Sequence, residues 1–381
     1  MITSRFPFPL EKGDKLRAYH QIKYLALYFE IHLISISDKN IQEEHVKELR
    51  PFCKSIQIHT ISWLQIIVGV LLKFMQNKPL QVGYFHHYSI QKKINTYLKN
   101  LKPDHIYCQL IRTSEYVKNY HDCPKTIDYM DALSKGIERR AKSMRFLKKY
   151  IFEMEHKRLL LYENSIFEYF EYHTIISNQD KNYIFHKNRD KIKVIPNGIS
   201  NDFLEYNENP EKECDLIFIG NMSYPPNVGA AQFIVNEILP LLSPQTKVRI
   251  VGASPSKEVQ KLSSSQVEIV GYVDDIQAAY KSASVFVAPM FIGTGLQNKL
   301  LESMALSIPC ITTNLANNAL RAKPEEEILI ANDATSFAEQ IQRLQSDPKL
   351  YQKISKNARD FILENYQWDS ITADLKSLIN N

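Results

Sequence analysis

The chain has 381 residues, 44% of them hydrophobic and 23% charged, a composition typical of soluble globular proteins. This length exceeds the roughly 250–300 residues that one hydrophobic core usually supports, so we expect two domains. The 11% aromatic content excludes an intrinsically disordered chain, and only 11 Gly and 17 Pro exclude a collagen-like or linker-like chain.

The cysteines and the N-terminal residues indicate a cytoplasmic protein. No two cysteines form a C-x-x-C pair, which argues against a disulfide framework or a zinc site and favours small buried side chains. Residues 1–9 lack the apolar segment of a secretory signal. The most apolar window, residues 61–75, contains Lys73 and is shorter than the roughly 20 residues that span a bilayer. The cysteines are Cys53, Cys108, Cys123, Cys214 and Cys310.

The charge is divided unevenly between the two halves of the chain. Residues 1–200 hold 32 Lys and Arg against 20 Asp and Glu, a net charge of +12. The remaining residues hold 15 basic and 22 acidic side chains, a net charge of −7. Opposite signs predict two domains with different partners.

The first half alternates helical stretches with short apolar runs. A helical pattern over residues 17–28 precedes the first β-branched run, and the charged interval 134–170 is helical, with more than one helix. Helical sequence beside each run predicts a parallel sheet with crossover helices. The apolar runs cover residues 30–36, 105–108, 125–128 and 173–177.

A break in the pattern separates the two halves. Residues 191–199 form a strand interrupted by Pro196 and by Asn197-Gly198, a pair that allows a turn with positive φ. The polar, Pro-containing tract 205–213 then resembles a linker. We place the domain boundary near residues 200–213.

The second half predicts a doubly wound parallel sheet, because strands and helices alternate at regular spacing. Helices begin near Asn227, Pro255, Asp275 and Leu296. The expected strands cover residues 215–220, 248–252, 267–271, 284–288 and 308–312.

Glycines concentrate at the ends of the strands in the second half. Ligands of open α/β sheets bind at the carboxyl ends of the strands, so these glycines mark a binding edge or serve only as turns. In residues 291–305 a Gly-containing loop opens a helix, whose free N–H groups and positive dipole suit an anion such as diphosphate. The glycines are Gly220, Gly252, Gly271, Gly293 and Gly295.

Two charged side chains lie near the start of that helix. Lys299 can add a positive charge next to a diphosphate, and Glu302 can accept hydrogen bonds from the hydroxyls of a ribose. Because the two stand three residues apart, they can equally form a surface ion pair.

Familiar phosphate motifs are absent from the sequence. It contains no P-loop, no G-x-G-x-x-G fingerprint and no D-x-D pair that would hold a metal on a nucleotide diphosphate. Neutralisation by a helix end and basic side chains, without an obligatory Mg²⁺ or other cofactor, is therefore expected.

Residues 293–311 (GTGLQNKLLESMALSIPCI) resemble the donor-binding signature of the retaining glycosyltransferases of family 4. Residues 195–199 resemble the interdomain hinge of that family, and residues 366–368 the start of its C-terminal helix. At the other end, residues 4–9 and 13–17 resemble the opening of a bacterial exopolysaccharide subgroup. Further similarities cover residues 218–222, 226–227, 251–252 and 271–275.

The resemblance implies the GT-B fold, an α/β architecture of two Rossmann-like doubly wound domains that face each other across a cleft. Residues 1–200 would be the acceptor-binding domain, 201–365 the nucleotide-sugar-binding domain, and 366–381 a helix that crosses back to the first domain. The implied activity is transfer of a sugar from a nucleotide diphosphate donor, with retention, to a glycan or lipid-linked glycan in cell-surface polysaccharide biosynthesis.

The resemblance also implies roles for individual residues. Glu302 would hold the donor ribose, Lys299 would neutralise the diphosphate, and the segment Gly271, Tyr272 and Val273 would present backbone to the base. The loop at Gly13 and Lys15 would face the acceptor or phosphate, with Arg17 helping to hold it. The other donor-binding positions would be Gly220, Asn221, Gly293, Thr294, Gly295, Leu296, Gln297 and Asn298.

The sequence departs from the family pattern at four places. Thr294 stands where the family commonly has a second Glu that contacts the sugar, which leaves the donor sugar undefined. Asn221 and Met222 stand near the usual position of a basic pair. Residues 127–131 lack a His often found there. Met1 is expected to fall inside the family's first strand, in which case an upstream segment would be absent.

The first half offers two carboxylates for the chemistry. Asp128 and Asp131 follow a predicted strand end, where they would orient the acceptor hydroxyl or the sugar, or else cap a turn or helix. A dedicated base is not required, because the departing phosphate oxygen can take the acceptor proton. Stabilisation of the leaving diphosphate is the main contribution expected of the protein.

The basic first half also suggests a membrane contact. Basic residues over 139–158 and the apolar window 63–75 would rest on anionic lipid and reach a lipid-linked acceptor, or else form a solvated helix and a buried core helix.

Two other functions fit parts of the sequence. One is a nucleotide-sugar epimerase of the same fold, and the other is a non-enzymatic protein that binds polyanions. The acidic second half and the lack of a recognition motif argue against nucleic acid as a partner.

Overall fold

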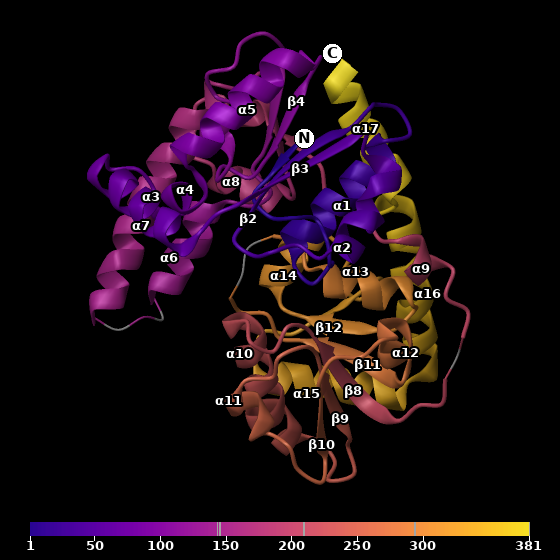
Figure 1. The fold of residues 1–381 in the computed structure, drawn as a ribbon. Helices are drawn as coiled ribbons and strands as arrows, with labels where there is room; N and C mark the ends of the chain where they lie inside the picture. Colours follow the sequence, from indigo (N-terminus) through magenta and orange to yellow (C-terminus); the bar gives the residue numbers. More distant parts are fainter. Residues whose placement is uncertain (143, 145, 209, 293–294, 381) are drawn as a thin grey trace. The chain divides into compact units, whose positions relative to one another are not determined.

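The computed structural model describes residues 1–142, 144, 146–208, 210–292 and 295–380. The described chain divides into two compact units, which Figure 1 traces by colour along the sequence. Unit 1 comprises Met1–Pro196 and Ile371–Asn381, and unit 2 comprises Asn197–Ser370. Unit 1 is therefore built from two separate stretches of the sequence.

Unit 1 contains a seven-stranded, all-parallel sheet in the order β3-β2-β1-β4-β5-β6-β7. Its strands are β1 (Ile2–Thr3), β2 (His32–Ser37), β3 (Ser55–Thr60), β4 (Ile106–Gln109), β5 (Lys125–Asp128), β6 (Tyr172–Ile175) and β7 (Lys193–Val194). Its helices are α1 (Gly13–Leu25), α2 (Glu43–Leu49), α3 (Trp63–Met75), α4 (Leu80–Phe85), α5 (Tyr88–Leu101), α6 (Leu133–Lys142), α7 (Phe146–Phe167) and α8 (Asn178–Tyr183), and α17 (Trp368–Asn380) contributes its residues from Ile371 onward.

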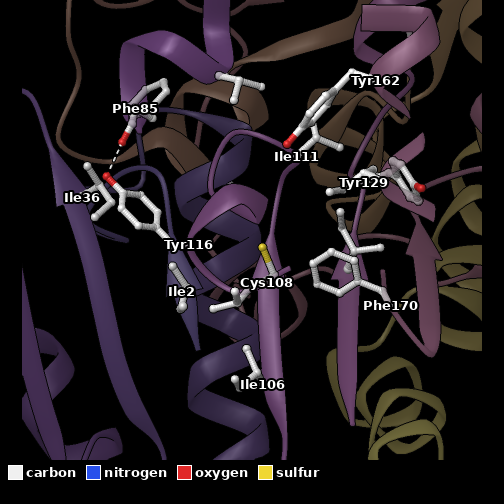
Figure 2. Close-up of a cluster of buried hydrophobic side chains, with 14 of the residues drawn as sticks. Ile2, Ile36, Phe85, Ile106, Cys108, Ile111, Tyr116, Tyr129, Tyr162 and Phe170 are labelled. Atoms are coloured by element: carbon white, nitrogen blue, oxygen red, sulfur yellow. Dashed lines mark hydrogen bonds between the residues drawn. The ribbon is translucent and has the colours of Figure 1, made fainter. Parts of the chain in front are cut away.

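The core of unit 1 lies between this sheet and its helices. Figure 2 shows part of it, where Ile2, Ile106 and Cys108 on the central strands are buried among aromatic side chains. The hydroxyl of Tyr116 donates to the carbonyl oxygen of Phe85 at the end of α4 over 2.6 Å. An aromatic side chain that also satisfies a buried carbonyl fixes the loop after β4 against α4.

Unit 2 contains a six-stranded, all-parallel sheet in the order β10-β9-β8-β11-β12-β13. Its strands are β8 (Cys214–Ile219), β9 (Val248–Val251), β10 (Val267–Val270), β11 (Ala283–Ala288), β12 (Cys310–Thr312) and β13 (Leu329–Ile330). Its helices are α9 (Asn201–Leu204), α10 (Pro225–Phe233), α11 (Lys257–Gln260), α12 (Ile276–Lys281), α13 (Asn298–Ala305), α14 (Asn314–Leu320), α15 (Ala334–Ser346) and α16 (Pro348–Asn365).

These two parallel sheets confirm the predicted α/β class and the Rossmann-like form of each unit. The helical interval expected over residues 134–170 is two helices, α6 and α7. The strand order reverses beside β1 in unit 1 and beside β8 in unit 2, and parallel α/β sheets bind their ligands at such points.

The five cysteines are free, and three of them are buried. In the part of the chain that the structure describes, no helix combines the length and the apolarity needed to cross a bilayer.

Candidate functional site

The N-terminus of α13 lies at the carboxyl edge of the sheet of unit 2. Gly295 precedes it with a φ of 81°, a left-handed conformation that favours glycine. The N-cap residue, Gln297, makes no side-chain hydrogen bond to the helix, whereas Asp275 caps α12 and Thr313 caps α14. The first N–H groups of α13 therefore remain available to an anion. Gly293 and Thr294, also expected here, lie outside the described residues.

Asn298, the first residue of α13, is held by the segment after β7. The side-chain nitrogen of Asn197 donates to its side-chain oxygen over 3.0 Å. Since Asn197 is buried, the Asn-Gly pair expected to form a turn also anchors this helix end.

Lys299 is a half-buried cation without a carboxylate partner among the described ion pairs. Its ammonium donates to Oδ1 of Asn227 on α10 over 2.6 Å and lies 4.6 Å from the ring centre of Phe218 on β8. Burial lowers the pKa of Lys299 from 10.5 to about 7, an effect that Glu302 opposes. An anion bound here would restore the full charge.

Asn227 is in turn oriented by the loop after β8. Its side-chain nitrogen donates to the backbone oxygen of Asn221 over 3.0 Å. Asn221 itself accepts from the backbone N–H of Ser223 over 2.9 Å. Asn221 is one of the residues expected to contact the donor. In the structure its backbone oxygen orients the side chain of Asn227, which in turn accepts the hydrogen bond from Lys299.

Glu302 lies one turn further along α13. Its Oε2 accepts the hydroxyl of buried Tyr280 over 2.8 Å, and its Oε1 has no hydrogen-bond partner in the described chain. Burial raises the pKa of Glu302, while the hydrogen bond from Tyr280 and the charge of Lys299 act to lower it. The hydrogen bond from Tyr280 fixes Oε2 of Glu302, and Oε1 is available to a hydroxyl of a ligand.

Glycines bring the backbones of neighbouring strand ends into contact at this edge. A Cβ atom on Gly252, whose φ is +152°, would lie 1.7 Å from the backbone oxygen of Gly220. A Cβ on Gly220 would lie 2.6 Å from Nδ2 of Asn227 and 3.1 Å from Nζ of Lys299. Gly220 therefore leaves the room that both polar side chains occupy.

The remaining predicted residues of unit 2 flank this edge. Gly271, Tyr272 and Val273 follow β10, with the Tyr272 ring 76% exposed. Leu296 is buried beside Gly295. The structure thus brings together Gly220, Asn221, Lys299 and Glu302, and adds Asn227 and Tyr280, which were not predicted as site residues.

In unit 1 the structure gives Arg17 and Asp128 a different environment from the one expected. Both side chains are fully buried, and the guanidinium donates twice to the carboxylate, over 2.7 and 3.1 Å. Asp128 also accepts from Thr174 over 3.0 Å, and Arg17 donates to the carbonyl of Pro196 over 3.2 Å. A pair so enclosed is suited to hold β5, β6 and α1 together rather than to contact a substrate.

Asp131 is the other predicted carboxylate. It follows Met130, whose left-handed φ of 63° is strained for a residue with a side chain. Burial raises the pKa of Asp131 to about 7, and nearby Asp180 adds to this, while Arg112 opposes it. A carboxyl group with a pKa near 7 can exchange a proton at neutral pH.

The predicted residues Gly13 and Lys15 both belong to α1. Gly13 is the first residue of the helix, and a Cβ there would lie 3.4 Å from the terminal methyl of Met130. Lys15 pairs with Glu11 over 3.2 Å.

The sequence did not point to Arg5 and Arg112, which lie near Asp14 of α1. Arg5 forms an ion pair with Asp14, and Nη1 of Arg112 lies 4.0 Å from the same carboxylate. Arg112 also packs over the ring of Phe85, at 5.6 Å from its centre. The cluster gathers residues from three separate segments, so no local motif reveals it.

No group of three or more His, Cys, Asp or Glu residues in the described ranges is arranged to hold a metal ion.

Known proteins resemble this chain in sequence and in fold. Residues 213–347, which include α13 and Lys299, match the family model "Glycosyl transferases group 1". An uncharacterized 44.6 kDa protein in the cps region of Klebsiella pneumoniae is 23% identical over 397 residues, covering 96% of this chain and 95% of the relative. The capsular polysaccharide biosynthesis glycosyltransferase CapM of Staphylococcus aureus is 29% identical over 116 residues, 30% of each chain.

A solved structure shows the same fold over the whole chain. Anabaena Alr3699/HepE, crystallised in complex with UDP and glucose, superposes with a TM-score of 0.70 at 12% identity, covering 100% of this chain and 98% of that one. Together these findings confirm the predicted GT-B fold, and they show a likeness to glycosyl transferases group 1 over residues 213–347.

Proposed function

We propose that this chain is a retaining glycosyltransferase that transfers a sugar from a nucleotide diphosphate donor to a glycan or lipid-linked glycan acceptor in cell-surface polysaccharide biosynthesis. The observation that carries the proposal is the α13 edge, where a helix N-terminus without a side-chain cap lies beside a cation that has no carboxylate partner in the described chain. Two relatives support it, since one lies in a cps region and the other is a glycosyltransferase of capsular polysaccharide biosynthesis.

We assign donor recognition to unit 2. The N–H groups from Gly295 to Asn298 and the ammonium of Lys299 would bind the diphosphate. Oε1 of Glu302 would accept a ribose hydroxyl, and the backbone after β10 would contact the base. The UDP bound to Anabaena Alr3699/HepE supports a nucleotide diphosphate as the ligand class.

The chemistry proposed is displacement on one face of the sugar. The bond from the anomeric carbon to the phosphate oxygen breaks, and its electron pair stays on the diphosphate. The acceptor oxygen bonds to the anomeric carbon, and its proton passes to the departing phosphate oxygen. Lys299 and the helix N-terminus stabilise the charge that develops on that oxygen, the contribution that usually dominates in such sites. No metal is assigned a part in this step.

We assign the acceptor side to unit 1. Asp131 would orient the acceptor hydroxyl, with Gly13 and Lys15 beside it. Asp128 and Arg17 would act as positioning residues, since their side chains are fully buried. The proposed location is cytoplasmic, with peripheral contact to an anionic membrane.

A ligand panel tests the proposal. Nucleoside diphosphates and their sugar conjugates should raise the melting temperature of the protein, because a ligand of the native state stabilises it. Glu302→Ala should weaken nucleotide affinity roughly tenfold to a hundredfold, the effect of losing a hydrogen bond to a charged group. Lys299→Ala should lower turnover on the order of a hundredfold. Lys356→Ala, an exposed lysine on α16, is the matched control and should change neither quantity.

The products decide between the remaining functions. NMR of the product formed with EDTA present should show the donor's anomeric configuration. Conversion of the nucleotide sugar to a stereoisomer without acceptor would instead identify an epimerase. Salt-dependent binding to nucleic acid, with no affinity for any nucleotide sugar, would identify a polyanion-binding protein.

A further inference from the structure

Helix α3 exposes one apolar half of its surface. Trp63 and Met75, at its two ends, are 67% and 79% exposed, and the apolar residues between them on this half are about half exposed. We call this half the α3 face. It consists of Trp63, Leu64, Ile67, Val68, Leu71, Leu72, Phe74 and Met75.

The opposite half of α3 is fixed against unit 1. A Cβ on Gly69 would lie 2.3 Å from the backbone oxygen of Gly83, so α3 and α4 touch backbone to backbone. Lys73 pairs with buried Glu115 over 3.0 Å, and Ile66 packs against the core. Because this half is held so closely, α3 cannot turn to bury the α3 face.

The charge around α3 favours an anionic partner. Residues 49–103 contain eight Lys and Arg and no Asp or Glu. At the C-terminal end of α3, Lys73, Lys78 and Lys118 all surround the single carboxylate of Glu115. Lys73 itself is buried with Glu115, and Lys78, with a side chain 31% exposed, is the most accessible cation of the three.

Arg158 of α7 adds a further cation to the same border. Its guanidinium lies 4.6 Å from the ring centre of Phe74 and donates to the neutral oxygens of Asn77 and Lys78. Figure 1 shows α7 beside α3, and α7 also exposes Leu147, Lys148, Lys149 and Tyr150. A second copy of this chain would place like charges opposite each other, so self-association on this face is disfavoured.

We propose that the α3 face inserts into the headgroup region of an anionic bilayer, with α3 lying in the membrane plane and the surrounding cations contacting lipid phosphates. A 13-residue helix is too short to span a bilayer, while an apolar face with an aromatic end and a cationic border is typical of interfacial helices. The inference rests on the proposed function, because binding to the membrane would bring the enzyme to a lipid-linked acceptor.

The tryptophans of the chain provide a direct measurement. Only Trp63 and Trp368 are present, and Trp368 is buried. With phosphatidylcholine vesicles that contain phosphatidylglycerol, Trp63 emission should shift to the blue and be quenched by brominated acyl chains. The Trp63→Phe variant should lack this response. The affinity for vesicles of phosphatidylcholine alone should be lower by roughly tenfold or more.

Paired leucine variants locate the surface. Leu64→Ser with Leu71→Ser should lower vesicle affinity roughly tenfold or more, as expected for two exposed leucines removed from an insertion face. Leu27→Ser with Leu241→Ser removes two exposed leucines elsewhere, 68% and 47% exposed against 57% for each of Leu64 and Leu71, and should leave the vesicle affinity unchanged. All variants should keep the nucleotide-dependent rise in melting temperature.

Two results would overturn the membrane proposal. One is absence of vesicle binding in protein that still responds to nucleotide. The other is a dimer, seen by light scattering, that the Leu64→Ser and Leu71→Ser pair abolishes. A loss of nucleotide response with vesicle binding intact would instead count against the proposed enzymatic function alone.

Discussion

Arg17 is a fully buried cation and Lys299 is a half-buried one, and the groups around them differ in one respect. Arg17 faces the carboxylate of Asp128, which satisfies its charge within the fold. Lys299 meets the amide oxygen of Asn227 and an aromatic ring, and its pKa falls to about 7. A cation already neutralised serves stability, whereas one without an ion-pair partner in the described chain favours an incoming anion.

Proton uptake on ligand binding follows from the lowered pKa of Lys299. Above pH 7 most of the free protein carries neutral Lys299, and a bound diphosphate would raise its pKa and draw a proton from solution. We expect calorimetric titration of UDP near pH 8, in buffers of different ionisation enthalpy, to show uptake approaching one proton. Nucleotide affinity should also fall as the pH rises through 7.

The Lys299→Gln variant is the control for this titration. It should bind UDP more weakly and without proton uptake, and its affinity should be nearly independent of pH above 7. Equal proton uptake in Lys299→Gln and in the unmodified protein would rule out Lys299 as the titrating group.

The Arg17–Asp128 pair predicts a stability effect. Removing one partner leaves a buried charge without compensation, so Asp128→Leu or Arg17→Met should lower the free energy of unfolding of unit 1 by about 3–5 kcal/mol. The double variant Arg17→Met with Asp128→Leu should lose less than either single variant. Urea unfolding curves measure the difference, and additive losses would show that the two residues act independently.

The sequence alone predicts some of these residues better than others. Lys299 and Glu302 share a helix start, so their spacing already points to a common site. Their partners Asn227 and Tyr280 come from other elements, and only the folded sheet brings them close. Arg17 and Asp128 are 111 residues apart, and nothing local indicates that each neutralises the other.

At the scale of elements, the site depends on how closely strand ends approach. Gly220 and Gly252 end adjacent strands, and no side chain fits between their backbones. Their role is to leave space for neighbouring groups, and Gly220 gives the room in which Asn227 and Lys299 meet.

Gly220→Ala should therefore disturb the site from the strand end. The new methyl group would displace Asn227 and Lys299, so we expect nucleotide affinity to fall at least tenfold in a protein that still folds. Gly229→Ala on α10 is the matched control, because apart from the adjacent residues and backbone of its own helix no atom lies within 4 Å of its added Cβ. Replacing a helical glycine should raise stability by about 0.5–1 kcal/mol and leave affinity unchanged. Thermal shift with and without UDP separates the two effects.

Elements with strong hydrophobic runs were predicted well, and those without them were not. The expected strands of unit 2 lie close to β8–β12, because buried parallel strands are continuous apolar segments. The two-residue strands β1 and β13 are too short to give such a signal. The window 63–75 predicted a helix that either contacts a membrane or is buried in the core, and only the packing of Gly69 against Gly83 shows which half is covered.

At the scale of the whole molecule, unit 1 is completed by residues distant in sequence. Leu375 of α17 is buried with Leu25 and Tyr107 in a small core of its own, and Lys376 lies 3.7 Å from the ring centre of Tyr28. The last segment of the described chain is thus an integral part of the first unit.

Truncating Leu375 should destabilise unit 1. Leu375→Ala leaves a cavity beside Leu25 and should cost about 2–5 kcal/mol of unfolding free energy. Asp374→Ala, on the exposed side of the same helix, should cost less than about 0.5 kcal/mol. Hydrogen exchange of α1 amides reports the loss locally, and similar protection in both variants would show that α17 contributes little.

The composition of unit 1 from two stretches of sequence affects how the protein is made. A ribosome adding roughly 5–20 residues per second spends on the order of ten to thirty-five seconds on Asn197–Ser370 before Ile371 emerges. Throughout that interval Leu25 and Tyr107 lack their final cover, while the stretch that forms unit 2 is being completed. The half translated first is therefore the half that finishes folding last, and nascent chains stalled before Ile371 should be the ones that chaperones retain.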